Sequence, residues 1–89
     1  MASVEMPVET QIALSELVRK TLEKHKIPFG RYEAMARDFA RKYWFAVVRN
    51  MDWYKEDLVD AFEAYGLPRP VLQDVAKSIE KRYGKREGG

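Results

Sequence analysis

The segment from Asp52 to Val75 constrains the fold more than any other part of the chain, because apolar residues recur at helical spacing on both sides of one short break. Gly66 and Pro68 lie in the break: glycine fits the left-handed position that ends many helices, and proline fits a helix start. Asp52 is a residue type favoured at helix N-caps. The segment therefore predicts two helices, over residues 53–65 and 68–83, joined by a sharp turn.

Two further helices are predicted ahead of this pair. Apolar residues at helical spacing indicate one helix from Pro7 or Thr10 to Lys26 and another over residues 31–50. Residues 27–30 contain a proline and a glycine and predict the break between them. The helix over 31–50 carries apolar stripes on two adjacent sides, so we expect it to have neighbours on both and to lie at the centre of the fold.

These patterns predict an all-α fold, a compact four-helix bundle whose last two helices form a helix-turn-helix-like hairpin. The chain has 89 residues, which is enough for one hydrophobic core, so we expect a single helical domain over residues 1–89. Residues 1–6 and 84–89 are expected to be frayed tails.

Composition excludes several classes of protein. The chain has no cysteine, which removes disulfide scaffolds, thiolate nucleophiles and cysteine-based metal sites. The longest apolar run, residues 43–48, is far shorter than the roughly 20 residues that span a bilayer, and no secretory leader is evident. We therefore expect a cytoplasmic protein without a membrane partner. A charged fraction of 34% with a single asparagine is also typical of thermophilic proteins.

The net charge of +2 is unevenly distributed along the chain. Residues 31–51 carry five basic and two acidic residues, and residues 67–89 carry six basic and three acidic ones. Residues 52–66, in contrast, carry five acidic residues and one lysine. Local potentials of opposite sign steer partners more strongly than the total charge does, so this pattern predicts an association surface.

The spacing around Gly66 resembles the helix-turn-helix motif of DNA-binding proteins. The motif's inward positions would be filled by Ala61, Tyr65, Leu67, Leu72 and Val75. Phe62 departs from the motif, which usually has alanine there because the two helices approach closely. Any pair of packed helices with a Gly-Leu-Pro turn would match equally well, so packing without DNA recognition is the alternative.

If the resemblance is functional, the outer face of the last helix would reach base edges or phosphates. That face would carry Arg69, Gln73, Lys77 and Lys81. Asp74 on the same helix and the acidic helix before it oppose a polyanion. A second basic set, on the helix over 31–50, consists of Arg37, Arg41, Lys42 and Arg49. These residues would either bind phosphates or form an ordinary solvated face paired with Glu33 and Asp38.

The helix over 53–65 supplies candidates for a protein partner or a homodimer contact. They are Trp53, Tyr54, Glu56, Asp60 and Glu63. An exposed Trp53 would anchor a partner or stack on a base, whereas a Trp53 that covers the helix start as a hydrophobic staple needs no partner. The acidic residues lack the glycine and alternating spacing of a calcium loop.

Nothing in the sequence indicates catalysis. His25 is the only histidine, and it has no second metal ligand or paired nucleophile nearby in sequence, so it is interpreted as a helix-capping residue. No glycine-rich phosphate loop or nucleophile elbow is present, and we expect no cofactor, metal or small-molecule ligand. The sequence thus predicts a non-enzymatic binding module, with nucleic acid as the first hypothesis, a protein partner or self-association as the alternative, and a small enzyme as a remote alternative.

Overall fold

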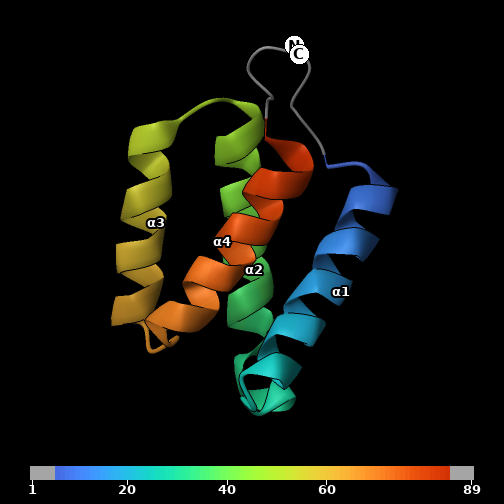
Figure 1. Cartoon of the computed structure of the whole chain (residues 1–89), viewed down its shortest axis with the longest axis vertical. Coiled ribbons are helices and arrows are strands. Elements are labelled where there is room, and N and C mark those ends of the chain that lie inside the picture. Colours follow the sequence, from blue (N-terminus) through green and yellow to red (C-terminus); the bar gives the residue numbers. More distant parts are fainter. Residues whose placement is uncertain (1–5, 85–89) are drawn as a thin grey trace.

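The computed structural model describes residues 6–84, which fold into four helices (Figure 1). In chain order they are α1 (Val8–Lys24), α2 (Phe29–Val48), α3 (Asp52–Ala64) and α4 (Arg69–Tyr83). This confirms the predicted all-α four-helix bundle. The parts of the expected frayed tails at residues 1–5 and 85–89 lie outside the described residues.

The two central helices are α2 and α4. Helix α2 contacts all three others, whereas α1 and α3 contact α2 and α4 but not each other over residues 6–84. In Figure 1, α4 crosses in front of α2 with α3 on one side and α1 on the other. This arrangement agrees with the central position predicted for α2 from its two apolar stripes.

The core lies where α2 meets its neighbours. Phe39 of α2 has no exposed surface, and its ring packs edge-on against Phe62 of α3 with the centroids 5.4 Å apart. Leu22 of α1 and Leu72 of α4 are also fully buried. Trp44 is 8% exposed and belongs to this core, as the helical spacing predicts. Removal of these apolar surfaces from water is the main force that holds the bundle together.

The ends of α1, α2 and α3 share one backbone arrangement. At each end a residue with positive φ follows the helix: Lys26 at 59°, Asn50 at 57° and Gly66 at 120°. The N–H of the next residue then reaches back to a carbonyl in the last turn, as from Leu67 to the carbonyl of Phe62 at 3.1 Å. This is the Schellman motif, which satisfies the free carbonyls at a helix end. Only Gly66 was predicted to occupy such a position.

Two predictions of where helices start are wrong, and so is the interpretation of Trp53 as a hydrophobic staple. Helix α2 begins at Phe29 and not at residue 31, because Pro28 serves as its N-cap and the break consists mainly of the Lys26 turn. Asp52 is the first residue of α3 and makes no cap hydrogen bond; its carboxylate lies 2.9 Å from Nζ of Lys55. Trp53 is therefore a helical residue, and its side chain is 66% exposed, so it does not act as a staple.

The predicted inward register of α3 is also partly wrong. Ala61 and Tyr65 are exposed, with Tyr65 69% exposed, whereas Leu58 and Phe62 are the buried residues of this helix. Helix α3 lies at the edge of the bundle and buries only a narrow stripe, so its flanking apolar residues remain in solvent. The resemblance to a helix-turn-helix therefore holds on the α4 side, at Leu67, Leu72 and Val75, and fails on the α3 side.

Within the described part of the chain, no helix combines the length and apolar character needed to cross a membrane.

Candidate functional site

The structure brings two of the predicted residue sets together along the junction of α3 and α4. We define the α3–α4 face as Glu56, Asp60 and Glu63 of α3 with Arg69, Gln73, Lys77 and Lys81 of α4. A cavity of about 320 Å³ lies between the two helices, with Tyr43 of α2, Val59 and Ala76 among its lining residues. Glu56 and Asp60 line its α3 side, and Arg69 and Gln73 line its α4 side.

Arg69 joins the two helices. Its Nη1 lies 2.6 Å from Oε1 of Glu63 and 3.3 Å from Oδ1 of Asp60. Hydrogen bonds to Glu63 and to Asp60 raise the pKa of Arg69 above its ordinary value, so the guanidinium remains charged. The N-terminal basic residue of α4, expected to reach a base or phosphate, is therefore engaged by α3.

The outer ridge of α4 remains open to solvent. Gln73, Lys77 and Lys81 recur at intervals of one turn, and all three are exposed as predicted. No carboxylate among residues 6–84 lies within the 4.0 Å ion-pair distance of Lys77 or Lys81. The two lysines thus present uncompensated positive charge beside the acidic residues of α3.

Asp74 lies on the opposite edge of α4, where it contacts α1. Its Oδ2 accepts a hydrogen bond from Nε2 of His25 at 2.6 Å and lies 3.2 Å from Nζ of Lys24. The hydrogen bonds from His25 and then Lys24 lower the pKa of Asp74. His25 does occupy the C-cap position of α1, as predicted, but its bond to α4 was missed because the two residues are 49 positions apart.

A chain of polar contacts behind the α3–α4 face also escaped prediction. The hydroxyl of Tyr43 donates to Oε2 of Glu80 at 3.0 Å, and Nζ of Lys55 lies 2.8 Å from the same oxygen and 2.9 Å from Asp52. Burial, followed by the bond to Glu80, raises the pKa of Tyr43 well above its usual range. Burial tends to lower the pKa of Lys55, but its bonds to Glu80 and Asp52 outweigh that effect and raise it.

The basic residues of α2 do not join the α3–α4 face. Nη1 of Arg37 lies 2.7 Å from Glu33, and Asp38 lies 3.1 Å from Arg41 and 2.8 Å from Lys42. These contacts are the local pairs expected of a solvated helix face. The hydrogen bond from Lys42 is the main reason that the pKa of Asp38 is lowered.

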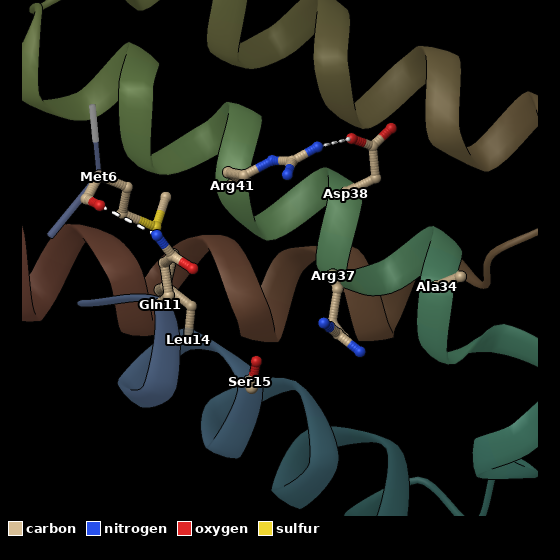
Figure 2. Close-up of a pocket in the computed structure, with 8 residues that line it drawn as sticks. All are labelled: Met6, Gln11, Leu14, Ser15, Ala34, Arg37, Asp38 and Arg41. Atoms are coloured by element: carbon tan, nitrogen blue, oxygen red, sulfur yellow. Dashed lines mark hydrogen bonds and ion pairs between the residues drawn. The ribbon is translucent and has the colours of Figure 1, made fainter. Parts of the chain in front are cut away.

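Arg37 and Arg41 instead border a cavity of about 270 Å³ between α1 and α2. Figure 2 shows Arg41 directed toward Asp38, whereas Arg37 extends into the gap between the helices near Ser15. The two guanidinium groups therefore do not converge on one point. Arg49, the fourth member of the predicted basic set, lies beyond α2 with its guanidinium 4.9 Å from the centre of the Phe45 ring.

Two exposed aromatic side chains lie at the two ends of α3. Trp53 in the first turn is 66% exposed, and its ring centroid lies 5.5 Å from that of the half-buried Tyr54. Tyr65 follows the last turn and is 69% exposed. Tyr54 and Tyr65 also line a cavity of about 310 Å³ between α2 and α3. Helix α3 therefore combines acidic and aromatic exposure, the combination predicted for a partner-binding helix.

Over residues 6–84, no three histidine, aspartate or glutamate side chains gather closely enough to hold a metal ion. Comparison of the chain with protein families, with curated proteins and with solved structures finds no match.

Proposed function

We propose that this protein is a non-enzymatic module that binds another protein through the α3–α4 face. The observation that carries the proposal is the separation of charge across that face: the acidic residues of α3 and the exposed Lys77 and Lys81 of α4 lie on neighbouring helices, and over residues 6–84 neither lysine has a carboxylate within ion-pair distance. A protein surface with the complementary arrangement of charges would satisfy both sides at once.

A polyanion fits this face less well. Phosphates drawn to Lys77 would also approach Glu56 on the neighbouring helix, and like charges there weaken the attraction. Arg69 is engaged by Asp60 and Glu63, and Arg37 is engaged by Glu33. Phosphate binding at these arginines would have to compete with existing carboxylate contacts.

Trp53 supports a protein partner independently of charge. Tryptophan is enriched among the residues that dominate binding energy at protein interfaces, where its large ring is removed from water. Here the side chain is 66% exposed at the start of α3, beside Asp52 and one turn before Glu56. A partner that covers this end of α3 would bury the indole while its basic residues meet the carboxylates.

The probe for this function is a synthetic helical peptide with a lysine ridge to meet α3, a glutamate ridge to meet Lys77 and Lys81 of α4, and one apolar ridge. We expect binding that weakens as salt rises, moves the Trp53 fluorescence to shorter wavelength and perturbs backbone amides of α3 and α4. Glu56→Lys should weaken binding, whereas Glu16→Lys, the same charge change on an exposed position of α1, should not. Amide changes confined to α1 or equal loss in both variants would contradict the proposal.

Nucleic-acid binding through the ridge of Gln73, Lys77 and Lys81 is the second candidate. It is favoured by the position of Asp74, the carboxylate expected to oppose it, because that group is already engaged by an ion pair with Lys24 and a hydrogen bond with His25. Titration with duplex DNA and structured RNA at low and moderate salt tests this function. Binding that weakens steeply with salt, and further in Lys77→Gln, would support it; no binding at low salt would exclude it.

A further inference from the structure

Some charged residues at the junction of α3 and α4 form ion pairs or hydrogen bonds within the chain, and others do not. Both carboxylates of α4 are engaged: Asp74 by Lys24 and His25, and Glu80 by Lys55 and the Tyr43 hydroxyl. The single lysine of α3, Lys55, is also engaged. Among residues 6–84, the charged side chains that remain without such a partner are therefore acidic on α3 and basic on α4. The residues concerned are Glu56 on α3, and Lys77 and Lys81 on α4.

Two internal ion pairs show which residues of α3 and α4 lie at the same level along the helix axes. Arg69 at the start of α4 pairs with Glu63 near the end of α3, and Glu80 near the end of α4 pairs with Lys55 near the start of α3. The helices are therefore antiparallel. Glu56 follows Lys55, and Lys77 lies about one turn before Glu80, so Glu56 and Lys77 lie at similar heights on neighbouring helices.

On the basis of the proposed function, we infer that the α3–α4 face binds a second copy of this chain in a two-fold symmetric dimer, with α3 of each copy against α4 of the other. Dimers with two-fold symmetry use the same patch on both subunits, and this patch carries both charges. Rotation about a two-fold axis parallel to the helices leaves the position of every residue along the helix axes unchanged. It therefore places Glu56 of one copy opposite Lys77 of the second copy, twice.

The charge pattern also selects between the two ways of joining these faces. A two-fold axis across the helices would place α3 against α3, with Glu56 and Asp60 opposite residues of the same sign. The axis parallel to the helices avoids this repulsion. It also brings Trp53, at the start of α3, to the level of Lys81 on the second copy, where the exposed indole faces an ammonium group.

Reciprocal charge reversal tests this dimer. Sedimentation of the full chain should show self-association that weakens with salt, and Glu56→Lys and Lys77→Glu should each weaken it about tenfold or more, because each variant creates two like-charge contacts. An equimolar mixture of the two variants should restore association, since the introduced lysine of one copy would then face the introduced glutamate of the other. Glu16→Lys, on α1, should associate as the unmodified chain does.

A chain that remains monomeric at about 1 mM would overturn the dimer, as would a mixture of folded variants that associates no better than either alone. Both variants replace exposed side chains, and circular dichroism verifies that they are folded. The synthetic helical peptide described above separates the two proposals. If it binds to α3 and α4 of a monomeric chain, the protein-binding function stands and only the dimer is lost; if the peptide fails as well, both are lost.

Discussion

Nε2 of His25 and Oδ2 of Asp74 lie 2.6 Å apart, and this contact fastens the end of α1 to α4. The Nζ of Lys24 lies 3.2 Å from the same oxygen and supplies a positive charge there. The carboxylate is thus stabilised in its ionised form by two residues of α1. Because α1 and α3 do not contact each other over residues 6–84, this edge of α4 is held independently of the α3–α4 face.

The Asp74 contact predicts acid-dependent stability. Bonds from His25 and Lys24 hold the folded-state pKa of Asp74 below its ordinary value of 3.8, so the unfolded chain takes up the proton first as pH falls. The stabilisation is therefore complete above pH 3.8 and is lost as pH falls through the lower folded pKa. Asp74→Asn should flatten the dependence of the free energy of unfolding on pH, measured by urea denaturation between pH 6 and 2. If Glu16→Gln flattened the pH dependence equally, the effect would come from the loss of any negative charge and not from the contacts of Asp74.

The Schellman turns predict opposite effects for two substitutions. Gly66 has φ 120°, so Gly66→Ala forces a side chain into a strained conformation and should lower the free energy of unfolding by about 1 kcal/mol or more. Lys26 has φ 59°, so Lys26→Gly should raise it by about 0.5 to 1 kcal/mol. Chemical denaturation measures both. Destabilisation by Lys26→Gly would show that the lysine side chain contributes more than its backbone conformation costs.

The contact between Tyr43 and Glu80 predicts a measurable loss when the hydroxyl is removed. Tyr43 is 6% exposed and donates to a carboxylate, so Tyr43→Phe should lower the free energy of unfolding by about 1 to 3 kcal/mol. Tyr65→Phe is the matched control, because Tyr65 is 69% exposed and should change stability by less than about 0.5 kcal/mol. Equal effects of the two substitutions in urea denaturation would mean that the buried hydrogen bond does not stabilise the fold.

The two tryptophans should be distinguishable by fluorescence. Trp44 is 8% exposed and should emit at shorter wavelength than Trp53, which is 66% exposed. Trp53→Phe should leave only the buried emission, which acrylamide quenches weakly, and should hardly change stability. Trp44→Phe should leave the readily quenched signal and destabilise the core. Strong quenching of the Trp53→Phe variant would contradict the burial of Trp44.

The helices were predictable because their signals are local. Helical spacing over residues 31–50 and the break at Gly66 each depend on neighbouring residues, as do the pairs of Arg37 with Glu33 and Lys42 with Asp38. The sequence does not determine which side of α3 is buried, because Tyr54, Ala61 and Tyr65 extend its apolar stripe on one side. Only the positions of α2 and α4 decide that Leu58 and Phe62 are buried while Tyr65 is not.

The sequence predicts which residues of the candidate site are exposed, but it does not predict how they are arranged on one surface. Exposure of Gln73, Lys77 and Lys81 follows from the helical spacing of α4. Their position beside Glu56 depends on how α3 and α4 pack. The bond between His25 and Asp74 joins residues 49 positions apart, and no local pattern contains that information. Packing also decides that Arg69 of α4 pairs with Glu63 and Asp60 of α3.

The most direct test of the α3–α4 face is the concentration dependence of backbone amide NMR shifts in the isotopically labelled full chain. The account predicts that dilution moves signals from α3 and α4, those near Trp53, Glu56, Lys77 and Lys81 most of all, while the outer face of α1 remains unchanged. Added salt should reproduce the effect of dilution, because free charges hold the copies together. Shifts centred on Val8 and Ile12, the exposed apolar residues of α1, would contradict the account and place the contact on α1.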